Sequence, residues 1–509
     1  MYPADKANFL GHRHAVVSGS NSFRSFSCFR FKNRARSRIL TSAGAWRMVS
    51  FDMHPYFEQL MQIFTAGVDR VDPYALVRDA LQLEDTLLKI DTKHFHQVFD
   101  LPENNRLLVV GAGKATARMA LAVEHVCGPR INAGCIVVKY GHTEALNTIR
   151  TLEAGHPVPD DRGVRGAREI LSLCEKADEN TLVLNLISGG GSALLANPCR
   201  HRIDRQYMDL TLPEKQSVTR RLLACGATID EINCIRKHLS GIKGGRLSLA
   251  ISPAVSLSLI LSDVVGDHLD VIASGPTVPD PTTYADMEAI LDKYRLSDKI
   301  PPKIMELVTL GKAGRLPETP KPGDPIFADS TNVLIGTNYL SLQAAAERAS
   351  QLGFKPVILS SQITGEAREV AKVLYGIGKD ARQRQLLGSG NLCVICGGET
   401  TVTIRGKGKG GRNQEMALAF LAEMKRSPAE AEGIYFLSGA TDGNDGPTDA
   451  AGACVSKELL ELARAAGLNI NAYLNDNNAY PFFDRIAHLV KTGPTNTNVC
   501  DLQLMLVIR

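Results

Sequence analysis

Short apolar runs alternate with longer amphipathic stretches along most of the chain, a pattern typical of strands that alternate with helices. The alternation predicts βαβ units and mainly parallel sheets. We expect strands at residues 106–110, 135–138, 182–187, 255–261, 333–335, 356–359, 392–396, 400–404, 434–438 and 504–508. We expect helices throughout 55–100 and at 115–126, 164–177, 213–225, 228–240, 338–352, 366–388, 413–424 and 456–466.

The stretch at residues 310–330 is rich in Pro, Gly and Lys and is the best candidate for a linker. A chain of 509 residues is also longer than one domain usually is. We therefore expect two α/β domains with mainly parallel sheets, at residues 51–310 and 311–509, behind a leader at 1–50.

The leader differs from the rest of the chain in composition. It holds nine Lys or Arg residues and one acidic residue, Asp5, with many serines between them. This composition suits a mitochondrial transit peptide, and the alternative is a disordered tail upstream of a start at Met48 or Met53. We favour a mitochondrial location, with the cytoplasm as the alternative.

The overall composition excludes several classes of protein. The net charge is +4, but outside the leader 49 basic residues stand against 53 acidic ones, so nothing indicates nucleic-acid binding. No apolar stretch approaches the roughly 20 residues that a membrane helix needs. Eleven cysteines are scattered along the chain. The pair Cys393 and Cys396 lies in an apolar, strand-like run, so we expect buried thiols and not a metal or redox site.

A first glycine turn, with Gly111, Gly113 and Lys114, follows a predicted strand and opens a helix. It is not a P-loop, because Ala115 stands where Ser or Thr should hold magnesium. It is not a complete dinucleotide fingerprint, because Thr116 replaces the third glycine. What remains is a lysine beside a helix N-terminus, which either binds an anion or is a solvated turn residue.

A second glycine turn interrupts the apolar run at 182–187. Ser188 is followed by Gly189, Gly190, Gly191 and Ser192, and then by an apolar, helix-compatible segment. Unpaired N–H groups at a helix start and glycines that admit a close backbone approach suit a phosphate. A tight turn without a ligand is the alternative.

A third glycine-rich region lies in the second half of the chain. Gly397, Gly398 and Glu399 follow a predicted strand, and a basic glycine loop then leads to Arg412 and Asn413 at a helix start. Arginine can grip a phosphate or a carboxylate through two hydrogen bonds. A solvated hairpin tip is the alternative, but it explains Arg412 and Asn413 less well.

Carboxylates follow two other predicted strands, Asp263 after 255–261 and Asp442 and Asp445 after 434–438. The carboxyl ends of strands face the crevice in which open α/β sheets bind ligands. Asp442 and Asp445 are candidates for holding magnesium, although turn chemistry alone also favours Asp at such positions.

A basic stretch at 233–246 contains Lys243, and it is either a solvated helix face or an anion site. Glycine turns combined with basic residues and carboxylates suit phosphoryl transfer, which needs positioning and charge neutralisation more than a covalent nucleophile.

The order of these motifs resembles the class II glycerate kinases, the family whose C-terminal part is called the MOFRL domain. The resemblance runs from about residue 55 to the C-terminus. It is carried by GAGK at 111–114, GHPVPD at 155–160, SGGGSA at 188–193, the stretch 233–246, LSDVVGD at 261–267, SGPT at 274–277, GGETT at 397–401, GGRNQE at 410–415 and TDGNDGPT at 441–448.

The resemblance implies two α/β domains with the active site in the cleft between them. It also implies phosphorylation of D-glycerate by ATP with Mg²⁺, in the catabolism of serine, fructose and glycerate. The expected product is 2-phosphoglycerate in preference to 3-phosphoglycerate.

Lys114 and Arg412 match the family's active-site lysine and arginine. We expect Lys114 to contact the transferred phosphoryl group, and Arg412 to neutralise phosphate or to hold the substrate carboxylate. From position alone, we predict that Asp263 accepts the hydroxyl proton and that Asp442 or Asp445 holds Mg²⁺. The other candidates are phosphate- or nucleotide-binding positions at Gly111, Gly113, Ser188, Gly189, Gly190, Gly191, Ser192, Gly397, Gly398 and Glu399, and substrate-binding positions at His156, Lys243 and Asn413.

Two other functions are consistent with these residues. Family members have also been labelled hydroxypyruvate reductases, but the incomplete dinucleotide fingerprint argues against an NAD(P)-dependent reductase. A binding protein without activity is the second alternative, and the intact set of Lys, Arg and Asp residues argues against it. We expect a small-molecule substrate, no nucleic acid and no membrane, and the sequence leaves the oligomeric state open.

Overall fold

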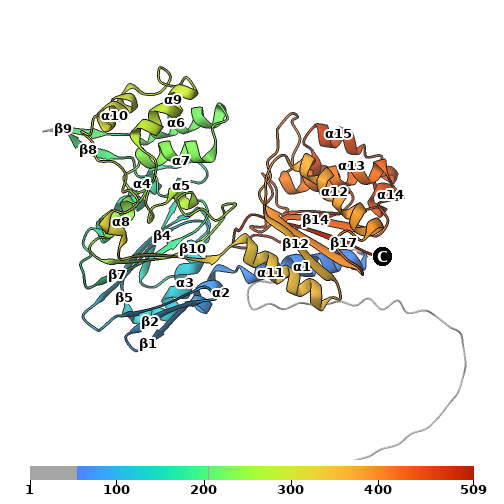
Figure 1. The fold of residues 1–509 in the computed structure, drawn as a ribbon, viewed down its shortest axis with the longest axis horizontal. Coiled ribbons are helices and arrows are strands. Elements are labelled where there is room, and N and C mark those ends of the chain that lie inside the picture. The colour runs from blue at the N-terminus through green and yellow to red at the C-terminus, as the bar shows by residue number, and fades with distance from the viewer. Residues whose placement is uncertain (1–53, 204–205) are drawn as a thin grey trace, which may run out of the picture. The chain divides into compact units, whose positions relative to one another are not determined.

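The computed structural model describes residues 54–203 and 206–509, so the predicted leader lies outside the described residues. Two six-stranded sheets with helices around them form the framework (Figure 1). This arrangement confirms the predicted α/β fold. Within the described ranges, none of the helices has the length and apolar character needed to cross a membrane.

The first sheet is parallel throughout, with the order β11-β10-β7-β4-β5-β6. This is the doubly wound order, in which the chain reverses direction between β4 and β7 and ligands bind beyond the carboxyl ends of those two strands. The bounds of the strands are β4 (Arg106–Ala112), β5 (Ile131–Lys139), β6 (Ile149–Ala154), β7 (Thr181–Ile187), β10 (Val255–Leu261) and β11 (Ser330–Gly336); the connecting helices are α3 (Thr116–Cys127), α4 (Asp161–Cys174) and the short α5 (Gly191–Leu194).

A helical layer with its own apolar core is inserted around β10, and it includes side chains such as Val218, Ile235 and Leu307. Three of its helices begin with a capping box, in which Thr211, Thr228 or Thr283 is the N-cap. The layer contains β8 (Arg200–Ile203), β9 (Gln206–Asp209), α6 (Leu212–Ala224), α7 (Ile229–His238), α9 (Tyr284–Lys293) and α10 (Pro302–Lys312). Helix α8 (Arg246–Ile251) instead packs Leu247 and Ile251 against the first sheet.

The second sheet is mixed, with the order β12-β13-β17-β14-β15-β16. Strand β12 is parallel to β13, whereas β17 runs antiparallel to both of its neighbours, β13 and β14. The apolar pattern of a buried strand does not reveal its direction, so the sequence could not predict this. The bounds are β12 (Lys355–Ile363), β13 (Leu392–Gly398), β14 (Ile434–Ala440), β15 (Gly452–Ser456), β16 (Leu489–Val490), β17 (Asp501–Val507), α11 (Asn338–Gln351), α12 (Ala367–Arg384), α13 (Arg412–Arg426), α14 (Glu458–Ala465), α15 (Ile470–Asn475) and α16 (Ala479–Arg485).

Cys393 and Cys396 lie in β13 and are both buried free thiols, as predicted. Side chains three apart on a strand point to opposite faces, so the two sulfurs cannot act as a pair. Burial raises the pKa of each thiol to about 12.

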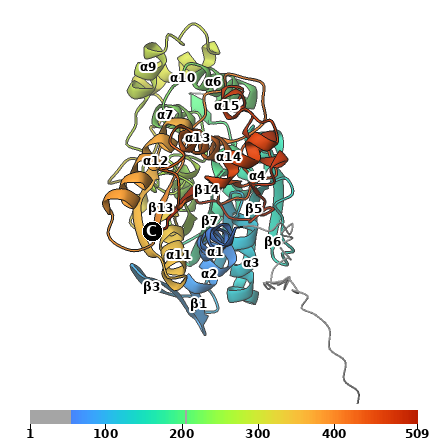
Figure 2. The same ribbon diagram turned by 90° about the vertical axis from the view of Figure 1, so that its right-hand side faces the viewer.

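The two sheets divide the chain at other points than the predicted boundary at residue 310. Strand β11 pairs with β10 in the first sheet. Helix α1 (Pro55–Arg70) packs on the second sheet beside α11, as both ribbon views show (Figures 1 and 2), and it buries Phe57, Leu60 and Phe64 there. We therefore call α2 (Pro73–Ala80) through β11 the first domain, and α1 with α11 through β17 the second domain.

Two local predictions are wrong. Residues 81–100 are not helical but form an antiparallel three-stranded sheet of β1 (Leu81–Glu84), β2 (Leu87–Thr92) and β3 (Phe95–Asp100). Its strands alternate inward and outward side chains, which is the period of a strand. The strand predicted at 400–404 is an extended loop with one isolated bridge, at Thr401.

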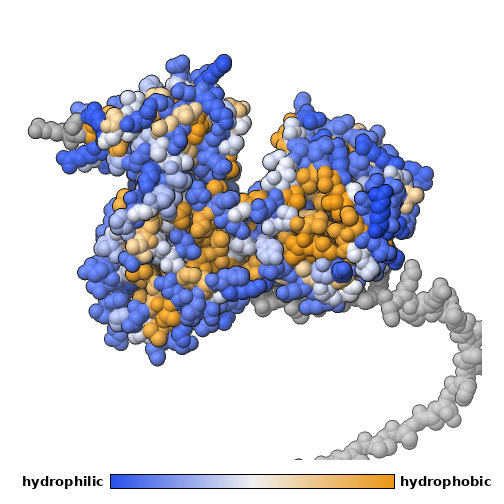
Figure 3. Space-filling model, in the orientation of Figure 1, coloured by the Kyte–Doolittle hydropathy of each residue, from blue (hydrophilic) through white to orange (hydrophobic). Residues whose placement is uncertain are grey.

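Strand β12 is one of the two edge strands of the second sheet, and its side chains are partly buried or exposed. The space-filling view shows apolar surface over this part of the second domain (Figure 3), and Leu359 is one of the exposed apolar residues.

Candidate active site

The glycine turns after β4 and β7 are hydrogen-bonded to each other at the point where the strand order reverses. The Lys114 N–H donates to the Gly189 carbonyl at 2.8 Å, and the Ala115 N–H donates to Ser188 Oγ at 3.1 Å. Gly113 has a φ of +152°, and a Cβ there would lie 1.9 Å from Ser188 Oγ. Ser188, predicted as a phosphate-binding residue, does not line the cavity described below, and its hydroxyl accepts a hydrogen bond at the start of α3.

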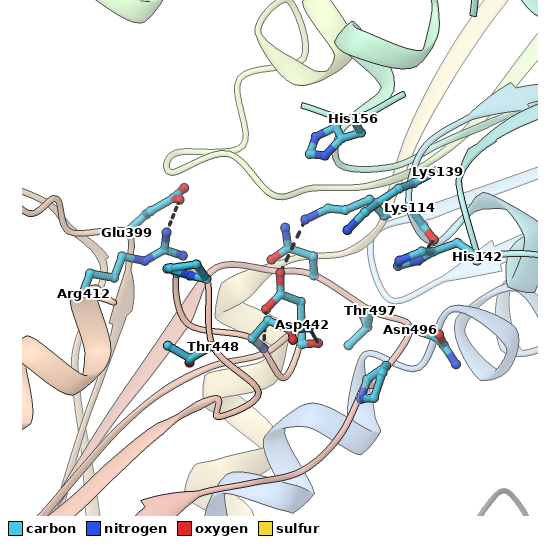
Figure 4. Close-up of a pocket in the computed structure, with 15 residues that line it drawn as sticks. Lys114, Lys139, His142, His156, Glu399, Arg412, Asp442, Thr448, Asn496 and Thr497 are labelled. Atoms are coloured by element: carbon cyan, nitrogen blue, oxygen red, sulfur yellow. Dashed lines mark hydrogen bonds and ion pairs between the residues drawn. The ribbon is translucent and has the colours of Figure 1, made fainter. Parts of the chain in front are cut away.

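A cavity of about 460 Å³ opens beside this junction and is lined by residues of both domains (Figure 4). The structure brings together five of the predicted site residues in its wall: Lys114, His156, Glu399, Arg412 and Asp442. The other lining residues, which sequence reasoning missed, are Lys139, His142, Asn444, Gly446, Pro447, Thr448, Pro494, Asn496, Thr497 and Asn498. Lys139 ends β5, so its position at a strand end was the available signal.

Lys114 and Asp442 come from different domains and face each other in the cavity. The Lys114 Nζ lies 3.4 Å from Asp442 Oδ2, and the side chains are 19% and 27% exposed (Figure 4). Burial, with the charges of Lys114 and Lys139, lowers the pKa of His156 to about 4, so this imidazole is neutral at physiological pH. One side of the cavity therefore presents two ammonium groups beside a neutral ring, which favours an anionic ligand.

Arg412 begins α13 and is held by two carboxylates. Its Nε and Nη2 donate to Asp501 at 2.6 and 2.9 Å, and its Nη1 lies 2.8 Å from Glu399 Oε1. Asp501 is fully buried, and the antiparallel course of β17 sets it opposite Gly398 and Ala440 at the ends of β13 and β14. Asp501 was missed because it begins a strand whose direction the sequence does not give.

Asp263 is not one of the residues that line the cavity, but its side chain is only partly buried and lies against the Ser188–Ser192 turn beside it. A Cβ at Gly189 would meet its Oδ2 at 2.1 Å, so only glycine at 189 leaves room for this carboxylate. Burial raises the pKa of Asp263, and the positive charge of Lys114 acts in the opposite direction. A carboxylate with a raised pKa near the cavity suits a proton acceptor.

Three predicted residues point elsewhere. Asp445 is buried at the start of α13, where its two oxygens accept the Asn413 and Gln414 N–H groups at 3.1 and 2.8 Å. The Asn413 side-chain oxygen accepts from Ser438 Oγ at 2.6 Å. Lys243 is buried in the first domain, with its Nζ 2.5 Å from the Leu195 carbonyl. None of the three lines the cavity.

The remaining predicted glycines serve close packing. A Cβ at Gly111 would lie 2.2 Å from the Leu186 carbonyl oxygen, and one at Gly397 would lie 1.9 Å from the Asn338 side-chain oxygen. Gly398, at φ +137°, and Gly191 are similarly crowded, whereas Gly190 lies against Lys114 and His156. The Ser192 hydroxyl lies 2.8 Å from that of Ser274.

No group of three or more His, Cys, Asp or Glu side chains within residues 54–203 and 206–509 is placed to hold a metal ion. Mg²⁺ in phosphotransfer sites is often held by one or two carboxylates together with substrate phosphates and water. Asp442 fits that pattern because it lines the cavity, whereas both oxygens of Asp445 are occupied by backbone N–H groups.

Comparison with known proteins identifies the family of this chain. Residues 59–309 match a family described as a domain of unknown function, DUF4147, and residues 392–501 match the MOFRL family. A glycerate 2-kinase of Pyrococcus horikoshii is 38% identical over 88% of this chain and 96% of its own length. A protein of Agrobacterium vitis named putative hydroxypyruvate reductase is 41% identical over 88% of this chain and 94% of its own length.

Among solved structures, the glycerate kinase of Thermotoga maritima matches with a TM-score of 0.74 and 35% identity. The match covers 89% of this chain and 99% of that one, which is more than either domain alone. By this similarity over nearly its whole described length, the chain belongs to the glycerate kinase family that carries the MOFRL domain.

Proposed function

We propose that this chain transfers the γ-phosphoryl group of ATP to the 2-hydroxyl of D-glycerate. The observation that carries the proposal is the cavity in which Lys114 of the first domain meets Asp442, Arg412 and Glu399 of the second domain. Membership of the family makes the chain a kinase, and the name of the Pyrococcus horikoshii relative supports the 2-hydroxyl.

We assign different roles in the reaction to the cavity residues. Lys114 neutralises the charge of the transferred phosphoryl group, because its ammonium group enters the cavity beside a helix N-terminus. Arg412 binds the substrate carboxylate or a phosphate oxygen, while Asp501 fixes the plane of its guanidinium group. Because phosphoryl transfer depends mainly on positioning and charge, this set is sufficient without a covalent nucleophile.

Mg²⁺ is the group that a kinase of this kind would need in addition. Asp442 would hold it together with the nucleotide phosphates, and the ion would neutralise their charge. Asn444 N–H donates to Asp442 Oδ1 at 3.0 Å, which fixes the carboxylate at the cavity wall.

Asp263 is our candidate for accepting the proton of the substrate hydroxyl. Asp263→Asn is expected to lower kcat about 10²- to 10⁴-fold, because the amide cannot take up a proton. In the wild type, the raised pKa of Asp263 means that kcat should fall on acidification at a pH above the ordinary aspartate range. A pH–rate profile tests this; an acidic limb that survives unchanged in the residual activity of Asp263→Asn would assign it to another group.

The function is tested by incubating the purified full chain with ATP, Mg²⁺ and D-glycerate, with enolase, pyruvate kinase and lactate dehydrogenase as coupling enzymes. NADH oxidation without added phosphoglycerate mutase identifies 2-phosphoglycerate, whereas a signal only with the mutase identifies 3-phosphoglycerate. If no ADP forms either with or without the mutase, the proposed kinase activity is refuted.

The same preparation is incubated with hydroxypyruvate and NADH or NADPH without coupling enzymes. We expect no change in absorbance, because Thr116 replaces the third glycine of the dinucleotide fingerprint. Its hydroxyl is buried and lies 3.3 Å from the Leu186 carbonyl oxygen.

For the cell, we propose a mitochondrial role in glycerate catabolism, which imaging of the full chain with and without residues 1–47 would test.

A further inference from the structure

Four cationic side chains lie together inside the first domain, where α6, α7 and α8 meet the segment that follows α5. Lys215 and Lys243 are only 9% and 2% exposed. Arg236 and Arg246 are half-buried. None of these four, which we call the cation cluster, lines the cavity between the domains.

The cation cluster lacks an acidic partner within residues 54–203 and 206–509. In the part of the chain that the structure describes, no carboxylate oxygen lies within 4 Å of any of its charged nitrogens. Lys215 Nζ donates to the Asn197 carbonyl at 3.4 Å, and Lys243 Nζ donates to the Leu195 carbonyl at 2.5 Å. Arg246 donates from Nη1 to the Lys237 carbonyl at 2.9 Å, whereas its Nη2 is buried with no hydrogen-bond partner among the described residues.

The neighbouring Lys237 is a buried lysine that does have acidic partners. It is as buried as Lys243, but its Nζ lies 3.1 Å from Asp270 and 3.4 Å from Asp280. Burial of an ion without such a partner is costly, and here the charges also repel one another. Burial and the charges of Arg236 and Arg246 lower the pKa of Lys215 to about 8. Burial and the charges of Lys215 and Arg236 lower that of Lys243.

We propose that the cation cluster binds a phosphate group. A phosphate offers several acceptor oxygens and more than one negative charge, which matches two lysines and two arginines that come from three helices and one turn. A single carboxylate would leave most of this charge uncompensated. The phosphate belongs either to a nucleotide or to a free phosphate anion, and the chemistry of recognition is the same.

The test measures binding and not turnover. Inorganic phosphate and ADP without Mg²⁺ are titrated calorimetrically into the full chain at constant ionic strength. Arg236→Gln is the informative variant, because within the described residues the Arg236 side chain makes no hydrogen bond or ion pair that its loss would break. We expect it to weaken phosphate binding about tenfold or more, since one charge-assisted contact is lost.

Two variants serve as controls. Arg220→Gln removes an exposed charge from α6 and should bind phosphate as the wild type does. Arg236→Lys keeps the charge and should bind within a fewfold of the wild type. Without phosphate, Arg236→Gln should melt at or above the temperature of the wild type, because one of the repelling charges is gone.

Displacement of phosphate by ADP would identify the nucleotide as the source, and simultaneous binding of both would identify a separate site for free phosphate. Binding of both probes by Arg236→Gln with wild-type affinity, or no binding by the wild type, would overturn the proposal. The assay contains no glycerate, so a chain that binds phosphate through Arg236 but forms no phosphoglycerate would refute only the proposed kinase activity.

Discussion

Lys114→Met should lower kcat about 10³-fold or more and leave the fold intact. The Lys114 ammonium group is the cation that the first domain places at the junction of β4 and β7, and groups that neutralise charge in phosphoryl transfer contribute effects of this size. Its ion pair with Asp442 is partly exposed to solvent, so losing it should cost less than about 1 kcal/mol of stability. Methionine preserves the length of the side chain.

Coupled assays with saturating ATP and D-glycerate measure kcat, and thermal melting checks the fold. Lys139→Met is the matched control, because Lys139 lines the same cavity but the structure shows no hydrogen bond or ion pair for its side chain among the described residues. We expect Lys139→Met to lower kcat by much less. Equal losses in the two variants would mean that the cavity needs only its overall positive charge, and near-normal turnover by Lys114→Met would refute the assignment.

The first sheet and its turns were predictable because local patterns determine them. An apolar run that ends in glycine predicts β4 and β7, and their parallel alternation with helices places Lys114 and the Ser188–Ser192 turn at the same edge. The sequence could not show which of these groups are already engaged within the protein. Ser188 and Asp445 fit a ligand site by residue type, but both are occupied at helix starts.

The rest of the site depends on contacts between distant segments. Asp501 reaches Arg412 only because β17 enters the middle of the second sheet in the antiparallel direction. The loop at 494–498 lines the cavity for the same reason. In the sequence, Lys243 is one of several basic residues at 233–246, and its type gives no sign of a special role. Lys243 and Lys237 are equally buried, but among the described residues Lys237 has an acidic partner and Lys243 has none.

Arg412→Gln is expected to lower kcat about 10³-fold and also to destabilise the protein by about 3 kcal/mol. The loss of activity follows from the missing guanidinium group in the cavity. The loss of stability has a different origin, because Asp501 is fully buried and would keep its charge without a cationic partner. Chemical denaturation measures the free energy of unfolding, and the coupled assay measures kcat.

The pH dependence of this variant identifies the buried carboxylate as the cause. Burial raises the pKa of Asp501, and Arg412 opposes that rise, so the pKa should be higher still in Arg412→Gln. A raised pKa in the folded state means that the protonated form is favoured there. The loss in free energy of unfolding relative to the wild type should therefore be small below about pH 4, the ordinary aspartate pKa. It should grow as the pH rises through the folded-state pKa of Asp501.

The double variant Arg412→Gln with Asp501→Asn separates the two effects. Removing the buried charge should restore most of the stability and abolish the dependence of the stability on pH. We expect kcat to stay as low as in Arg412→Gln, because asparagine at position 501 supplies no cation to the cavity. Asp501→Asn alone should keep part of the activity, since Glu399 still holds the Arg412 Nη1. Recovery of kcat in the double variant would mean that Arg412 serves only the fold. A single variant as stable as the wild type at every pH would mean that Asp501 is not charged in the native protein.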